Sequence, residues 1–491
     1  MRSTRVLAIV AIGGLLLAGV LVDLRDRPAA DAGSQYTSAL AAPTSAVNTW
    51  FCPGGSGPSG IAELTVEMTN GSDHQQTVAV SVLPGRSGPQ EPAMFGVEMA
   101  PRGRVLLRPS ETMPGADWVG VMVETRGSDL VVEQILTASQ AGVGRSPCLT
   151  RVADSWVVSN GATRSAVEGE RFVVMLLNPF PDVAVADIEL VADVGRDSID
   201  GLVIPAQRVV AVDVTDEVTV AATVAAFINV VSGRVAASWI QVADGPIGGR
   251  GTRTAPAVAG AADLWHLPVV AVGAARRDVV AVSNPSTTEV AEVDVEVIPQ
   301  DPEIQVSPIE ITVRPGRTVL VDLSEQGRLA GIGHFSVAVR SLAAVPVAAS
   351  VTSVTSAPDP AGADDAAVAG SSATSGADGA SRRWLVPAEV PAADRDTELG
   401  GHAGALVIVN PSAAGIAEVD VSVGGELVRS IEVGPGRSRR LWLAPLGSDR
   451  FLVEVDASAP VVVGRELVGL TSRSASLGVA VEEPVPADAI R

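Results

Sequence analysis

The sequence predicts an all-β protein of tandem β-sandwich repeats, of the immunoglobulin or fibronectin-III type, after one N-terminal transmembrane helix. Four segments share one order of landmarks, and apolar residues alternate with polar ones inside them, as at Val293, Asp294 and Val295. Strands with that period bury one face and expose the other. The abundance of Val also favours strands, and 491 residues are too many for a single core.

The first 27 residues have the pattern of a membrane anchor. Residues 6–22 are uncharged and mostly apolar, with Arg2 and Arg5 before them and four charged residues directly after them. A signal peptide needs a small-residue cleavage site close behind its apolar core, and the Ala-x-Ala at 39–41 lies far downstream. We therefore expect residues 1–27 to be an uncleaved single-pass anchor in the cell membrane, with the bulk of the chain extracytoplasmic. Signal cleavage and secretion are the alternative.

Each repeat opens with a Trp at the head of an apolar run, and its next strand ends in an Asn. The tryptophans are Trp50, Trp156, Trp265 and Trp384, and the asparagines are Asn70, Asn178, Asn284 and Asn410. Pro restricts the residue before it to extended backbone, and Asn side chains cap turns. We therefore expect the asparagines to be structural, and the tryptophans to pack in the sandwich cores rather than to stack on sugars.

The spacing of the landmarks sets the expected domain boundaries. Successive asparagines lie 108, 106 and 126 positions apart, so an insertion precedes the fourth repeat. After a linker at 28–47, the expected repeats span residues 48–150, 151–250, 263–356 and 382–484. Residues 357–381 contain one large apolar side chain, Val368, and are expected to form a disordered linker. As an alternative to separate sandwiches, each repeat would form a pair of propeller blades.

The only two cysteines, Cys52 and Cys148, bracket the first repeat. In an immunoglobulin-type sandwich the first and last strands commonly lie side by side, so we expect a disulfide with Cα atoms about 4.4 to 6.8 Å apart. Disulfides persist outside the cytoplasm, in agreement with the anchor. Two unrelated buried thiols are the alternative.

No sequence motif for catalysis, cofactor binding or metal binding is found. The four histidines, His74, His266, His334 and His402, occupy different places in the repeat, so the repeat symmetry does not gather them. All 35 basic residues are Arg, against 56 acidic residues, and the net charge of −21 makes nucleic acid an unfavourable partner. The sequence predicts a protein that is not an enzyme and that uses no cofactor and no metal.

The landmarks resemble those of the membrane-anchored DUF5719 proteins of actinobacteria. The shared pattern is a Trp start, a strand ending in Asn-Pro, an acidic alternating strand, a Pro-Gly-Arg turn and a final Pro-Val-Val run. It covers residues 1–484, with Asn70-Gly71 in place of Asn-Pro in the first repeat and Ala206-Gln207 in place of Gly-Arg in the second. The resemblance implies an envelope location and extracytoplasmic β-sandwich repeats, and it offers no catalytic residue.

Two functions follow as expectations. The favoured one is a non-enzymatic scaffold or adhesion-type module of the cell envelope, which contacts cell-wall polymer or an envelope protein. The alternative is an accessory subunit that assists an envelope glycosyltransferase or binds glycan.

Overall fold

A computed structural model describes residues 47–87, 90–127, 129–139, 141–164, 170–243, 251–273, 276–355, 370–390, 404–443, 446, 449–468, 473–481 and 485–486. Almost all regular structure in this part is β-strand, and its helices are single turns: α2 (Pro109–Thr112), α3 (Val214–Glu217) and η2 (Gly327–Leu329). The prediction of an all-β fold without long helices is confirmed for these residues. The expected anchor at 1–27 and the linker up to residue 46 lie outside them. Within them, no helix has the length and apolar character to span a membrane.

Four repeats, called units 1 to 4, follow one another along the chain. Unit 1 comprises β1 (Asn48–Ser56), β2 (Glu63–Asn70), β3 (Gln76–Pro84), β4 (Ala93–Met99), β5 (Arg104–Leu107), β6 (Trp118–Thr125), β7 (Leu130–Ala138) and β8 (Gly142–Pro147). Unit 2 comprises β9 (Ser155–Gly161), β10 (Arg171–Asn178), β11 (Ala184–Ala192), β12 (Arg196–Ile204), β13 (Arg208–Asp213), β14 (Val224–Ser232), β15 (Ala236–Ala243) and β16 (Gly251–Pro256).

Units 3 and 4 repeat this order. Unit 3 comprises β17 (Leu264–Ala271), β18 (Arg276–Asn284), β19 (Ala291–Pro299), β20 (Ile309–Val313), β21 (Arg317–Asp322), β22 (His334–Ser341), β23 (Ala348–Thr355) and β24 (Gly370–Ser375). Unit 4 comprises β25 (Gly379–Val390), β26 (Gly404–Asn410), β27 (Ala417–Val423), β28 (Glu426–Val433), β29 (Arg437–Trp442), β30 (Asp449–Val468), β31 (Arg473–Leu477), β32 (Val479–Ala480) and β33 (Val485–Pro486).

Each unit folds into two antiparallel sheets that pack face to face. Sheet I holds the first, sixth, third and fourth strands in that order, and sheet II holds the last, seventh, second and fifth. In unit 4 the long strand β30 takes the places of both the sixth and the seventh strand. In unit 1 the parallel pair of Ser56 and Glu63 joins the two sheets. The described part is therefore a tandem array of β-sandwich repeats, as predicted.

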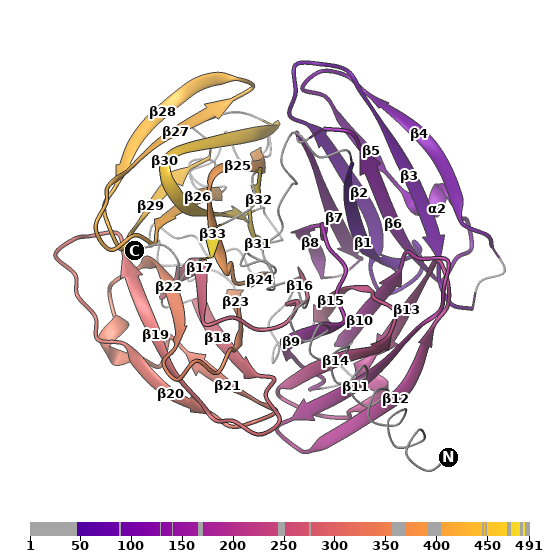
Figure 1. The fold of residues 1–491 in the computed structure, drawn as a ribbon, viewed down its shortest axis with the longest axis horizontal. Helices are drawn as coiled ribbons and strands as arrows, with labels where there is room; N and C mark the ends of the chain where they lie inside the picture. Colours follow the sequence, from indigo (N-terminus) through magenta and orange to yellow (C-terminus); the bar gives the residue numbers. More distant parts are fainter. Residues whose placement is uncertain are drawn as a thin grey trace, which may run out of the picture.

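The units close into a ring around one axis. Sheet I of each unit packs on sheet II of the next unit, since β1 contacts β10 and β15, β9 contacts β18 and β23, and β17 contacts β26 and β30. Unit 4 closes the ring on unit 1, whose core takes in Leu385 and Leu452. Figure 1 shows the sheets arranged radially, as blades are in a β-propeller. The two sheets of each sandwich thus lie in the ring like a pair of propeller blades, which is the alternative that the sequence left open.

Two expected boundaries are wrong. The second repeat does not end at residue 250, because β16 pairs with β15 as the last strand of unit 2. The linker expected at 357–381 is wrong in its second part, because β24 completes sheet II of unit 3 and β25 begins at Gly379. β16 and β24 consist mainly of small residues, which lack the bulk to form a core alone but fit where other strands crowd them. Residues 357–369 lie outside the described part.

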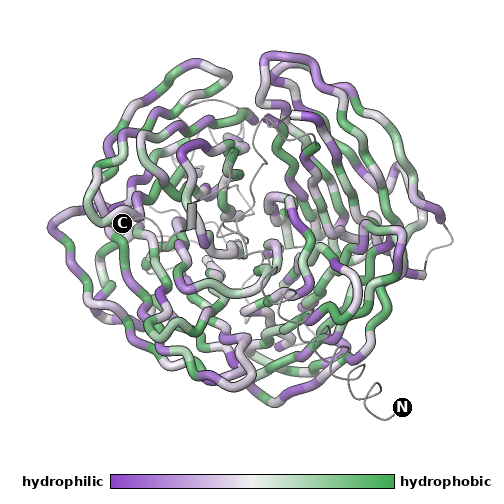
Figure 2. Tube along the Cα trace, viewed as in Figure 1, coloured by the Kyte–Doolittle hydropathy of each residue, from purple (hydrophilic) through white to green (hydrophobic). Residues whose placement is uncertain are grey.

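The period-two pattern places one apolar face of each strand against the partner sheet. In β19, Ala291, Val293 and Val295 are buried while Glu292 is exposed. Hydrophobic and hydrophilic residues alternate in the same way along the outer strands in Figure 2. Each unit has its own core cluster, and the clusters extend across unit borders: that of unit 1 includes Val173 and Met175 of unit 2.

Candidate functional site

The axis of the ring is the place where all four units meet. The last strand of each sheet II lies there, so that β8 and β31 contact each other and β16 contacts both β8 and β24. Glycines allow this approach: a Cβ on Gly144 would lie 2.8 Å from the carbonyl oxygen of Thr252, and one on Gly251 would lie 2.6 Å from the amide nitrogen of Ser371. Larger side chains at these positions would force the inner strands apart.

A pocket opens on the axis at the C-terminal ends of the inner strands. The space between its walls, together with the solvent at its mouth, amounts to about 380 Å³. Its lining comes from all four units: Ser146, Pro147, Ala255, Pro256, Ala257, Ala373, Thr374, Ser375, Gly376, Ala475, Ser476 and Leu477. These residues are small, apolar or hydroxyl-bearing, and no ionisable side chain lines the pocket.

Three hydroxyls line this pocket at equivalent places in the repeat, on Ser146, Thr374 and Ser476, and unit 2 has an alanine there. The Ser146 hydroxyl accepts a hydrogen bond of 3.0 Å from Gln134 Nε2, and the Ser476 hydroxyl accepts one of 3.0 Å from Arg465 Nε. The Thr374 hydroxyl is buried and makes no hydrogen bond to a described residue. Such a lining can hydrogen-bond water or a small neutral group, and it supplies no general acid, general base or metal ligand.

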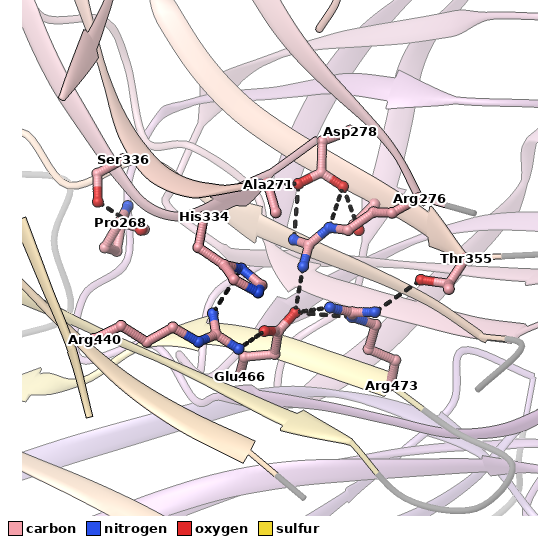
Figure 3. A network of polar contacts seen from close by, with 11 residues as sticks. Pro268, Ala271, Arg276, Asp278, His334, Ser336, Thr355, Arg440, Glu466 and Arg473 are labelled. Atoms are coloured by element: carbon pink, nitrogen blue, oxygen red, sulfur yellow. Dashed lines mark hydrogen bonds and ion pairs between the residues drawn. The ribbon is translucent and has the colours of Figure 1, made fainter. Parts of the chain in front are cut away.

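A cluster of buried charges lies between units 3 and 4 (Figure 3). Glu466, on β30, accepts from Arg276 of unit 3 at 2.9 Å, from Arg440 at 2.7 Å and from Arg473. Arg276 also pairs with its neighbour Asp278 at 2.7 Å. Three guanidiniums therefore surround two carboxylates, and strand pairing fixes all of them at the junction.

The second carboxylate of this cluster is fully bonded as well. Asp278 accepts from the Ala271 amide at 2.8 Å and from the Ser353 hydroxyl at 2.5 Å. Burial alone would raise the pKa of Glu466, but the charges of Arg473, Arg276 and Arg440 outweigh it and hold that pKa well below its usual value. A carboxylate so firmly ionised accepts hydrogen bonds and does not act as a general acid at neutral pH. The cluster therefore joins two units.

The four repeat tryptophans are buried at equivalent places, each at most 1% exposed. Trp156, Trp265 and Trp384 donate their indole N–H to the carbonyl oxygens of Val235, Val347 and Val461, which precede the seventh strand or lie at its start. Their burial confirms the expected core packing and leaves no indole face for a sugar.

The four repeat asparagines are buried and tie the second strand to two neighbouring segments. Asn284 Nδ2 donates to the carbonyl oxygens of Glu289, at 2.8 Å, and Val313, at 2.9 Å, while its Oδ1 accepts from the Ser286 amide at 3.0 Å. Equivalent bonds are made by Asn70, Asn178 and Asn410. The asparagines hold the turn after the second strand, as expected.

Cys52 and Cys148 form a disulfide with Cα atoms 4.7 Å apart, which confirms that prediction. The residues beside them, Phe51 and Leu149, pair through their backbones in the same unit. The bond therefore fastens the first strand of unit 1 to the segment after its last strand.

The histidines do not form a common site. His334 lies beside Arg440 in the buried cluster, with 3.1 Å between His334 Nδ1 and Arg440 Nη1, whereas His266 is buried on β17 and His74 is in unit 1. His402 lies outside the described part of the chain. Among the described residues, no group of His, Cys, Asp or Glu has a metal-binding arrangement.

Sequence reasoning did not find the axis or the buried charges. The one available signal is the pair Arg465-Glu466 inside the apolar run VVVGRELV, because ionised side chains in such a run require buried partners. Those partners lie in other units, and the sequence does not indicate which of its many arginines meet them.

Comparison with known proteins gives no family. No family model and no curated protein matches the chain. Among solved structures, a crystal structure of Thermotoga maritima 1070 is similar over 21% of this chain and 94% of its own, with 17% identity and a TM-score of 0.18. A tetra-tandem repeat in the extending region of a large adhesion protein is similar over 86% of this chain and 96% of its own, with 13% identity and a TM-score of 0.10. Both TM-scores are too low to carry an argument about function.

Proposed function

We propose that this chain is a non-enzymatic scaffold protein of the cell envelope, anchored by its N-terminal segment, which binds an envelope protein or cell-wall polymer through its outer strands. The outer strand of sheet I in each unit carries this proposal. In β28 the side chains are almost all exposed, including Leu427 at 61% and Val428 at 42%. Edge strands with free backbone groups accept extended segments of other molecules.

The disulfide and the fold support the same proposal. A disulfide that closes unit 1 suits an oxidising compartment outside the cytoplasm. The buried ionisable groups Glu466 and Asp278 bond to other groups of the ring, which is consistent with a structural role for them.

The proposal includes a distant kinship with immunoglobulin-type sandwiches and with DUF5719 proteins. In each unit the second strand pairs with the fifth and the third with the sixth, as B pairs with E and C with F in an immunoglobulin fold. The first strand, however, lies beside the sixth, where an immunoglobulin domain has its last strand.

The experiment is crosslinking of the full chain in its own membranes, followed by identification of the partner, together with co-sedimentation with purified wall material. Leu427→Glu on β28 is expected to reduce the crosslinked product at least fivefold. Val194→Glu, which changes an equally exposed side chain (64%) in a turn of unit 2, is the matched control and is expected to leave the product unchanged. Recovery of a glycosyltransferase would support the accessory-subunit alternative. The scaffold proposal fails if no partner is recovered and wall material does not bind.

A further inference from the structure

One junction of the ring, between unit 4 and unit 1, joins two units that do not follow each other along the chain. Short connections join consecutive units, such as residues 148–154 between β8 and β9 and residues 376–378 between β24 and β25. Unit 4 meets unit 1 without any such connection. We call this junction the seam; it lies between β25 and β30 on one side and β2, β7 and β8 on the other, at the top of Figure 1.

The seam differs from the other junctions in its charges. Between described residues, five ion pairs cross the seam, one crosses the junction of units 3 and 4, and none crosses the other two. The pairs at the seam are Arg102–Glu454, Arg145–Glu389 at 2.7 Å, Arg450–Glu67 at 3.2 Å, Arg383–Asp129 at 3.8 Å and Arg465–Glu133.

Four of these side chains form a closed circuit. Arg145 also lies 3.5 Å from Glu67, and Arg450 lies 2.9 Å from Glu389, so within the circuit each charge has two partners of opposite sign. Deeper in the seam, Arg465 and Glu133 are each only 2% exposed. Burial raises the pKa of Glu133, and the charge of Arg465 opposes that rise. A buried carboxylate in such a place depends on the cations beside it, chiefly Arg465.

These charges are absent from the same positions of the other units. The strand registers place Glu67, Glu133, Arg145 and Glu454 at defined positions of the repeat. Glu67 corresponds to Met175, Ala281 and Val407; Glu133 to Ser238, Ser350 and Gly464; Arg145 to Thr254, Ala373 and Ala475; and Glu454 to Met122, Phe227 and Ala338. At these four positions, uncharged side chains therefore suffice where a connection already brings two units together.

We propose that the seam is a charge-coded closure interface, in which the face of unit 4 matches that of unit 1 and rejects every other unit face. A charged face docked on a neutral one would bury unpaired guanidiniums and carboxylates, and that cost excludes wrong pairings. A second copy presents the same unit 1 face, so head-to-tail addition of copies competes with closure of the ring. The charge code and the high effective concentration within one chain together favour a closed ring of four units.

The test removes the deepest pair without leaving a lone charge. The double variant is Glu133→Ser, Arg465→Gln. Units 2 and 3 have Ser at the position of Glu133, and unit 1 has Gln at the position of Arg465, so both new side chains already occur at these places in the repeat. We expect amide hydrogen exchange in β2, β7 and β25 to rise at least tenfold, and light scattering after gel filtration to show masses above the monomer that increase with concentration. The matched control is Glu296→Gln, Arg340→Gln, which removes a partly exposed ion pair inside unit 3.

A second variant covers the case that the first does not fold. Arg102→Gln, Glu454→Gln removes a pair nearer the rim, with Arg102 27% exposed, and is expected to raise seam exchange about threefold while exchange in β10 and β18 stays at the wild-type rate. The proposal is overturned if the seam strands exchange at the wild-type rate and the variants stay monomeric. It is equally overturned if exchange rises to the same extent in β10 and β18, because the charges then stabilise the whole chain and do not control closure.

Discussion

His266 is a buried histidine at a position where the other units carry apolar side chains. Strand pairing places it in register with Phe51, Val157 and Leu385. The residue is 3% exposed, and neither ring nitrogen has a hydrogen-bond partner among the described residues. Burial, with a smaller contribution from the charge of Arg340, lowers its pKa to about 4. His266 therefore destabilises the junction of units 3 and 4 as the pH falls.

We expect His266→Leu to make the protein more resistant to acid. The unfolded chain binds a proton near pH 6.5 and the folded chain only near pH 4, so wild-type stability is lost as the pH falls from 6.5 to 4, by about 3 kcal/mol. The leucine variant lacks this loss. Urea unfolding at pH 7 and at pH 4 measures the difference, and equal losses in both proteins would contradict the assignment.

Asn284 carries a structural role that the sequence already indicated. Asn284→Ala leaves the carbonyl oxygens of Glu289 and Val313 without that partner, and we expect it to lower the free energy of unfolding by about 1 to 3 kcal/mol. Denaturant titration measures the change. Asn229→Ala, at an exposed position of β14, is the control, and a similar effect in both variants would refute the role.

At the scale of single residues, the sequence identified what recurs. The tryptophans, asparagines and cysteines could be found because a fourfold pattern, or a unique pair, singles them out. The partners of Glu466 and Glu133 could not, because a buried ion pair depends on which strands lie opposite, and those strands come from other units.

At the scale of elements, the ends of a unit meet in each repeat, but only unit 1 joins them covalently. Phe51 pairs with Leu149, Val157 with Val258 and Leu385 with Val479. The positions of Cys52 and Cys148 thus correspond in unit 2 to Val158 and Ala257, both buried in its core. Apolar packing therefore closes that unit without a bond.

Replacing Cys52 by Val together with Cys148 by Ala copies the pair of unit 2 into unit 1. We expect a folded variant that has lost about 2 to 5 kcal/mol of stability, because the 96-residue loop is no longer closed in the unfolded chain. Denaturant unfolding of the variant, compared with that of the oxidised and the reduced wild type, measures this. A variant as stable as the oxidised wild type would show that the bond adds nothing.

The inner strands show why element boundaries were harder to predict than element type. Residues 370–375, of sequence GSSATS, have the composition of a linker, and a composition argument assumes that a strand needs its own large side chains. On the axis, neighbouring strands supply the contacts, as where Gly251 touches Ser371. On the axis, side chains must therefore be small for the inner strands to pack against one another.

At the scale of the whole molecule, the units share their cores. The cluster around Trp50 contains Ile240 of unit 2 as well as Leu385 of unit 4. The four-repeat order, read from the sequence, gave the sandwiches correctly; it did not give the ring, because the contacts between sheets of different units follow no sequence pattern.

Shared cores predict that the described region unfolds as one cooperative unit. Trp384→Ala, which empties a core position in unit 4 and costs about 3 to 5 kcal/mol, is expected to lower one common melting temperature. Differential scanning calorimetry measures it, with the ratio of calorimetric to van't Hoff enthalpy expected near 1. Four separate unfolding transitions, of which only one is shifted by the substitution, would show that the four units unfold independently.

The seam also sets an order of events during synthesis. Glu133 and its partner Arg465 are 332 positions apart, so at about 5 to 20 residues per second the face of unit 1 waits roughly 17 to 66 s before unit 4 emerges. An apolar face exposed for that time would attract other nascent chains. The glutamates and arginines on this face keep that part of it hydrated until unit 4 arrives, so the residues that finally close the ring also help to keep the incomplete chain soluble.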